Sequence, residues 1–231
     1  MCSVRMLRAF SQIILACFIA ATGGRSWAFA AEVHAQLVSQ ISKMEPSAVI
    51  WLEPVQRSPT QLVKPGKFTL LQKNKTFIPH LLVVPVGSSV AFPNEDPFFH
   101  NVFSLFDGKR FDLGLYESGS TRSVIFSRKG VSYIFCNIHS EMSAVVIALD
   151  TPFYSIVDHH GAFQISGVPD GDYDLHVWLE GQSQSSLDEL TKQVHVDGPD
   201  VNLGEIHAGN PKRGHLNKFG RPYEPDSVPT Y

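Results

Sequence analysis

The stretch Cys136-Asn137-Ile138-His139-Ser140-Glu141-Met142 places a thiol, an imidazole and a thioether three residues apart in turn. It lies between two runs of strand-forming residues, 131–135 and 144–149. Because a short loop between two adjacent strands can aim its side chains at one point, we expect these three groups to converge.

A second imidazole, His100, lies upstream in the segment 94–103. One thiolate and two imidazoles in a trigonal plane, with a thioether at long axial distance, form the ligand set of a blue-copper electron-transfer site. The sequence therefore predicts one type 1 copper ion held by four ligands: His100, Cys136, His139 and Met142. Zinc is the alternative at a sulfur and imidazole site, but a thioether is a poor zinc ligand. Asn101 is expected to brace the cysteine-bearing loop through backbone hydrogen bonds.

Between Phe68 and Leu149 the chain is a series of short strand-like runs with turn residues between them. These runs are 68–71, 81–84, 89–92, 102–106, 120–126, 132–135 and 144–149. Two further runs lie within 32–52, the first of which also fits a helical period at Val33, Leu37 and Ile41, and a smaller set follows Thr151-Pro152. Since no segment shows a long helical period with caps, the pattern predicts an all-β protein built as antiparallel sandwiches or barrels.

The residues around the predicted ligands carry a family resemblance. Phe92-Pro93-Asn94, His100-Asn101-Val102 and Tyr133-x-Phe135-Cys136-x-x-His139-x-x-Met142 resemble the cupredoxins. The short Cys-x-x-His-x-x-Met loop is most similar to the amicyanin and pseudoazurin-plastocyanin group, and the whole chain resembles bacterial plastocyanin-like proteins labelled methylamine utilization proteins. The resemblance implies a Greek-key cupredoxin sandwich over residues 66–150. It also implies that His139 lies near the surface, ringed by apolar side chains, as the route for the electron.

A second resemblance covers the residues after the first. The pattern Asp158-x-x-Gly161-x-Phe163-x-Ile165-x-Gly167-Val168-Pro169-x-Gly171-x-Tyr173 is similar to carboxypeptidase regulatory-like, transthyretin-like sandwiches. We expect this smaller β-sandwich to combine residues 32–55 with 151–208. The cupredoxin would then be inserted into one of its loops, a hypothesis that fails if 49–52 pairs with cupredoxin strands.

The N-terminus is typical of a cleavable secretory signal over residues 1–30. Arg5 and Arg8 precede an apolar stretch, 13–21, that is too short to span a bilayer, and Ala28-Phe29-Ala30 is a small-x-small cleavage site. A lipoprotein signal at Cys17 is the alternative. Cleavage would leave Cys136 as the only thiol, which favours an occupied metal ligand in an oxidising, periplasmic location. Residues 209–231 are polar and rich in proline, and are expected to form a flexible tail.

Composition excludes several classes of function. The formal net charge is −3, without the basic excess that nucleic-acid binding requires. No run beyond the signal approaches membrane-spanning length, and no catalytic triad, P-loop or paired-carboxylate motif stands out. We therefore expect no enzyme but a single-electron carrier for a redox partner protein such as a cytochrome or a dehydrogenase. The alternative is an accessory protein that stores, delivers or sequesters copper.

Some residues outside the ligand set leave alternatives open. His80 is either an auxiliary ligand or a histidine at a strand start bonded to backbone, and His159-His160 either capture copper or are exposed turn residues. Three aromatic residues either contact a carbohydrate or fill the core of the second sandwich: Phe163, Tyr173 and Trp178. The aspartates around Gly171 lack a distal glutamate and are interpreted as a hairpin turn rather than a calcium loop.

Overall fold

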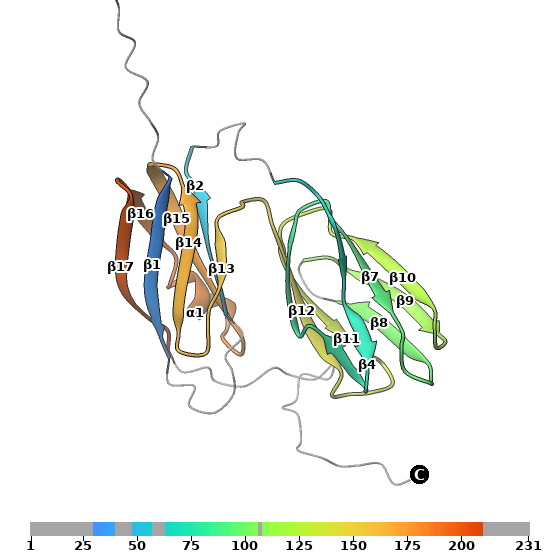
Figure 1. Cartoon of the computed structure of the whole chain (residues 1–231). Helices are drawn as coiled ribbons and strands as arrows, with labels where there is room; N and C mark the ends of the chain where they lie inside the picture. The colour runs from blue at the N-terminus through green and yellow to red at the C-terminus, as the bar shows by residue number, and fades with distance from the viewer. Residues whose placement is uncertain (1–29, 40–47, 57–62, 106–107, 210–231) are drawn as a thin grey trace, which may run out of the picture.

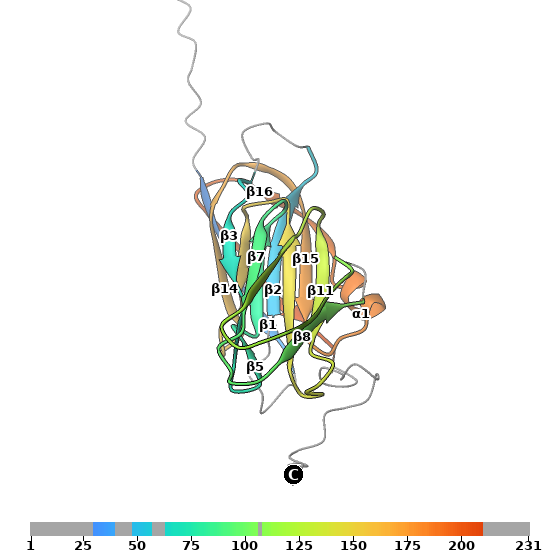
Figure 2. The same ribbon diagram turned by 90° about the vertical axis from the view of Figure 1, so that its right-hand side faces the viewer.

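The computed structural model describes residues 30–39, 48–56, 63–105 and 108–209. These residues form two β-sandwiches that lie side by side (Figure 1), so the prediction of an all-β sandwich protein is confirmed. Figure 2, turned by 90°, shows strands of both sandwiches running in roughly the same direction. The predicted signal segment 1–30, apart from its last residue, and the predicted tail 209–231, apart from its first, lie outside the described residues.

The first sandwich takes strands from both ends of the chain, and we call it the split sandwich. One sheet has the order β14-β1-β17, the other β13-β2-β15-β16. The elements are β1 (Ala31–Val38), β2 (Ala48–Pro54), β13 (Tyr154–Ile156), β14 (Ala162–Val168), β15 (Gly171–Leu179), α1 (Gln184–Asp188), β16 (Lys192–Val196) and β17 (Asp200–His207). Strand β1 buries every second residue, as a half-buried strand should.

Strand pairing places the N-terminal strands in the split sandwich. β1 pairs antiparallel with β14 and parallel with β17, and β2 pairs antiparallel with β13 and β15. This is the pairing that the insertion hypothesis requires. The domain limits and the kinship with carboxypeptidase regulatory-like sandwiches stay predictions.

The second sandwich, which we call the central sandwich, covers residues 67–149. Its sheets have the orders β10-β7-β3 and β6-β12-β11-β8-β9, and the hairpin β4-β5 lies at one end. The strands are β3 (Lys67–Thr69), β4 (Leu71–Lys73), β5 (Thr76–Ile78), β6 (Leu81–Pro85), β7 (Ser89–Pro93), β8 (His100–Ser104), β9 (Phe111–Tyr116), β10 (Thr121–Ile125), β11 (Gly130–Phe135) and β12 (Ser143–Leu149). Sequence reasoning missed β9, whose alternation is interrupted by Gly114 at φ 64°. It also missed the break at Leu70 that separates β3 from β4.

Strand β12 explains why the apolar run 144–149 is unbroken. Val145, Ile147 and Leu149 belong to a core shared with β2 and β15 of the split sandwich. Ala144, Val146 and Ala148 belong to the inner core of the central sandwich. Successive side chains of a strand point to opposite faces, so β12 is buried on both. Each large apolar side chain buried in this way contributes roughly 1.5–3 kcal/mol.

Polar contacts also join the two sandwiches. His80 Nε2 lies 2.8 Å from Glu180 Oε1, and Lys129 Nζ lies 2.7 Å from Glu53 Oε2. Trp178 Nε1 donates to the Tyr133 hydroxyl at 3.4 Å. The apolar core and these contacts make the split sandwich a support for the sheet that carries β8 and β11.

Candidate metal centre

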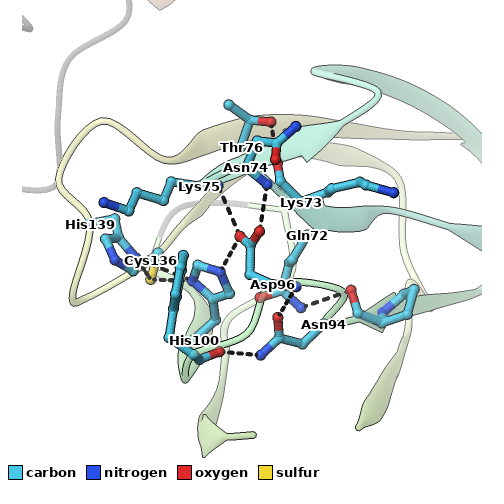
Figure 3. A network of polar contacts seen from close by, with 12 residues as sticks. Gln72, Lys73, Asn74, Lys75, Thr76, Asn94, Asp96, His100, Cys136 and His139 are labelled. Atoms are coloured by element: carbon cyan, nitrogen blue, oxygen red, sulfur yellow. Dashed lines mark hydrogen bonds and ion pairs between the residues drawn. The ribbon is translucent and has the colours of Figure 1, made fainter. Parts of the chain in front are cut away.

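Three of the four predicted ligands converge at one end of the central sandwich (Figure 3). His100 is the first residue of β8, Cys136 follows the last residue of β11, and His139 lies in the loop before β12. Cys136 Sγ lies 3.7 Å from His100 Nδ1 and 3.8 Å from His139 Nδ1, and the two Nδ1 atoms are 3.2 Å apart. The side chains therefore offer one sulfur and two imidazole nitrogens to a single ion.

The loop from Cys136 to Met142 is closed by its own backbone. The N–H of Cys136 donates to the carbonyl of Met142 at 3.1 Å, and the N–H of Met142 donates to the carbonyl of His139 at 3.1 Å. Met142 is fully buried in the same apolar core as Cys136. These bonds fix where the loop residues point, while the axial role of the Met142 thioether stays a prediction.

The site is buried except at one imidazole. His100 and Cys136 are buried, whereas His139 is half-buried. The Phe98 ring packs on both histidines, with centroids 5.3 Å from His100 and 5.4 Å from His139. Ile138, the neighbour of His139 in the chain, is 51% exposed. His139 is therefore the member of this cluster that lies nearest to solvent.

Local hydrogen bonds favour the thiolate form of Cys136. Burial raises the pKa of this thiol, but the hydrogen bond with His100 and the backbone N–H groups of Asn101, His139 and Ile138 more than offset it, so the pKa lies below its ordinary value. Because the thiolate is the form that binds metal, the site is prepared for a soft cation.

The two imidazoles differ in their electrostatic surroundings. Burial lowers the pKa of His139, and the positive charges of His100 and Lys75 lower it further. Burial also lowers the pKa of His100, but the hydrogen bonds with Cys136 and Asp96 outweigh it and raise the pKa overall. The half-exposed His139 is thus held in the neutral form that a metal ligand needs.

Asn101, the second residue of β8, contacts a residue on each side of this strand, Cys136 after β11 and Asp112 in β9. Its backbone N–H faces the Cys136 sulfur. Its side-chain Nδ2 donates to Asp112 Oδ1 in β9 at 2.7 Å, and its Oδ1 is buried without a hydrogen-bond partner among the described residues. The side chain therefore ties β8 to β9, and the backbone N–H is the group that contacts the cysteine.

Sequence reasoning missed a buried carboxylate behind His100. Asp96 Oδ2 accepts a hydrogen bond from His100 Nε2 at 2.8 Å, and Asp96 is only 4% exposed. The same carboxylate accepts from the backbone N–H groups of Asn74 and Lys75 at 2.6 and 2.9 Å. A buried charge is rare unless it is paired, and the four-residue spacing from Asp96 to His100 was the only signal in the sequence.

A polar network supports the loop that carries Asp96. Asn94 Oδ1 accepts from the N–H of Asp96 at 3.0 Å, and Asn94 Nδ2 donates to the carbonyl of Phe98 at 2.8 Å. Gln72 Nε2 donates to the Tyr116 hydroxyl at 2.5 Å, and burial raises the pKa of Tyr116 to about 12. Asn94 thus braces the loop before β8 from within, while Gln72 of β4 and Tyr116 of β9 hold the carbonyls of Phe92 and Pro93 just before it.

The remaining candidates lie apart from the centre. His80 bonds the carbonyl of Ser143 and Glu180. Within the described residues the cluster of possible ligands contains neither His80 nor His159-His160, which are exposed turn residues. Phe163, Tyr173 and Trp178 are buried core residues, so the idea that these three rings stack on a carbohydrate is wrong.

No family model and no curated protein matches the sequence. Among solved structures, the copper-containing nitrite reductase of Thermus scotoductus SA-01 is 23% identical with a TM-score of 0.35, over 42% of this chain and 25% of its own length. A purple cupredoxin from Nitrosopumilus maritimus is 24% identical with a TM-score of 0.33, over 35% of this chain and 98% of its own length. An amicyanin mutant in its reduced state is 20% identical with a TM-score of 0.34, over 43% of this chain and 99% of its own length. The chain thus spans a quarter of the length of the reductase.

In the described part of the chain, no helix has both the length and the apolarity needed to cross a membrane.

Proposed function

We propose that this protein carries single electrons between redox partner proteins, using one type 1 copper ion held by His100, Cys136, His139 and Met142. The observation that carries the proposal is the meeting of two Nδ1 atoms and one thiolate-favouring Sγ, with a half-exposed imidazole on one side. This donor set suits copper, because soft sulfur favours Cu(I) and imidazole binds both oxidation states.

The chain's own residues keep the site rigid and dry. Bound copper would supply the one-electron step between Cu(II) and Cu(I). His100 is the first residue of β8, and the other three candidate ligands lie in a short loop that is closed by its own backbone bonds between β11 and β12, so none comes from a loose segment. Burial of Cys136 and His100 keeps water from the sulfur, while His139 remains open toward a partner. These features favour electron transfer without a substrate of the protein's own.

The partner and the compartment are part of the same proposal. The signal-like segment 1–30 supports export to a periplasmic location. So does the fact that its cleavage would leave Cys136 as the only thiol. A cytochrome or a dehydrogenase is the class of partner that a one-electron carrier serves, and we propose no enzymatic activity of its own.

The visible spectrum tests the proposal. Purified protein loaded with copper and oxidised should bind one copper per chain and show an intense thiolate-to-copper band that ascorbate bleaches. Cys136→Ser should lose the band, because a hydroxyl does not supply the thiolate. Ser140→Ala, in the exposed part of the same loop, should keep it. A colourless Cu(II) protein, or a preparation that retains zinc in preference to copper, would contradict the proposal.

Copper exchange separates an electron carrier from a copper store. A storage or delivery protein should give up copper readily to a competing chelator and offer further accessible ligands. His80, one of the candidates for such a ligand, is already bonded to the carbonyl of Ser143 and to Glu180. We therefore expect slow copper loss together with fast electron self-exchange; rapid loss with slow self-exchange would favour the accessory role.

A further inference from the structure

Asp96 is a buried carboxylate that accepts hydrogen bonds from three donors: His100 Nε2 and the backbone N–H groups of Asn74 and Lys75 (Figure 3). Its exposed fraction is 4%, and that of the His100 side chain is zero. A buried carboxylate is costly unless it is fully bonded. The structure satisfies this one with His100 Nε2 and two backbone N–H groups, so it is a built feature of the site.

The bond with Asp96 decides which nitrogen of His100 faces the metal. A carboxylate only accepts, so His100 Nε2 carries a proton, and Nδ1, on the side of Cys136, is the nitrogen that gives up its proton when a metal ion binds. Hydrogen bonds of this kind fix the tautomer and the ring orientation of a metal-binding histidine and raise its basicity.

The other side of the carboxylate holds a turn. Asn74 and Lys75 adopt positive φ angles of 56° and 58° in the connection between β4 and β5, and both N–H groups donate to Asp96. Lys75 Nζ lies 5.6 Å from the centre of the Phe98 ring, which packs on both histidines. One carboxylate therefore joins the buried His100 to the lysine next to the half-exposed His139.

We propose that Asp96 is a positioning residue that sets the reduction potential of the copper site and holds the Asn74-Lys75 turn in place. The inference rests on the proposed function. Reduction adds one electron and removes one positive charge from the centre. A fixed negative charge in a buried site interacts more favourably with the more positive, oxidised form, so Asp96 lowers the potential.

Asp96→Asn removes the charge and keeps the size of the side chain. The amide oxygen still accepts from His100, so the variant should remain blue. The Cu(II)/Cu(I) equilibrium against a common redox mediator should shift at least tenfold toward Cu(I), which is 59 mV for a one-electron couple. Glu95→Gln is the matched control. It also removes one negative charge, but from the neighbouring residue, whose side chain is 51% exposed. Solvent screens that charge, so its shift should be at most a small fraction of the Asp96→Asn shift.

A second measurement uses the unmodified protein. In the reduced, diamagnetic form, the Nε2 proton of His100 should exchange slowly with water and give a resolved NMR signal, because it is buried against Asp96. Equal potentials for Asp96→Asn, Glu95→Gln and the unmodified protein would overturn the inference. A fast-exchanging Nε2 proton would overturn it even where Asp96→Asn failed to fold. Loss of the blue band in the unmodified protein would instead refute the proposed function itself.

Discussion

The two sandwiches differ in what they bury. Among the described residues, eight of the nine buried polar or charged side chains belong to the central sandwich: Gln72, Ser88, Asn94, Asp96, His100, Asn101, Ser104 and Ser132. The ninth, Thr151, lies in the link that follows it. The split sandwich has an apolar core of the ordinary kind. Four of the eight, Asn94, Asp96, His100 and Asn101, lie in the short stretch of chain that contains the candidate ligand His100, and the other sandwich supplies support.

The described part of the central sandwich also contains buried polar atoms that make no hydrogen bond. Three buried polar atoms have no hydrogen-bond partner among the described residues: Gln72 Oε1, Asn101 Oδ1 and Ser104 Oγ. Each such atom costs about 1–3 kcal/mol. We therefore expect substitutions in the split sandwich to change the free energy of unfolding alone, and polar substitutions in the central sandwich to change the copper spectrum as well.

The largest loss of stability should come from the split sandwich. Leu175 is fully buried between β2 and β16, and Leu175→Ala should lower the free energy of unfolding by about 2–5 kcal/mol. The copper spectrum should not change, because Leu175 belongs to the core away from the ligands. Urea unfolding and a visible spectrum check both, with the half-buried Leu203→Ala as the milder control. A shifted copper spectrum in Leu175→Ala would show that the core of the split sandwich influences the ligands directly.

A polar substitution in the central sandwich should affect both properties. Asn94→Ala removes the bonds to the N–H of Asp96 and to the carbonyl of Phe98. Stability should fall by about 1–3 kcal/mol, and the copper spectrum should shift because the loop before His100 loosens. Asn202→Ala, at an exposed position of the split sandwich, should stay within about 0.5 kcal/mol of the unmodified protein. An unchanged spectrum in Asn94→Ala would show that this network serves stability alone.

Met142→Leu tests the predicted role of the Met142 thioether as the axial copper ligand. Leucine has nearly the volume of methionine, so stability should fall by less than about 1.5 kcal/mol. Copper should stay bound, because the axial contact is weak, and the potential should rise because the electron-poor Cu(II) form loses a donor. Voltammetry and metal analysis measure these effects. If both spectrum and potential match those of the unmodified protein, Met142 is a core residue and not a ligand.

Local sequence patterns predicted the candidate ligands but not the residues that hold them in place. Cys136, His139 and Met142 share one short loop, so their spacing alone indicates a common centre. The unbroken run in β12 was visible, but its burial between two sandwiches depends on pairing with distant strands. The bond from Asn74 to Asp96 and the bond from Gln72 to Tyr116 join residues 22 and 44 positions apart, which no local pattern reveals. Only the four-residue spacing between Asp96 and His100 is local.

The smallest effect should come from the second histidine–carboxylate pair. His80–Glu180 and His100–Asp96 have the same length, 2.8 Å, but the His80 side chain is 42% exposed and that of His100 is buried. The hydrogen bond to Glu180 raises the pKa of His80 above 6.5 in the folded protein. Its stabilisation is therefore fully present below pH 6.5 and is lost as the pH rises through the raised value.

This pair should contribute less than about 1 kcal/mol, because solvent screens it. We expect the unfolding free energy of His80→Gln, measured from about pH 5 to about pH 9, to differ from that of the unmodified protein only at the acid end. Glu180→Gln should remove the same increment, since it takes away the partner instead of the histidine. A difference that grows toward alkaline pH would mean that His80 stabilises the contact between the sandwiches as a neutral side chain. The exposed pair would then act as a neutral hydrogen bond, in contrast to the buried pair, in which we propose that the charge of Asp96 sets the potential.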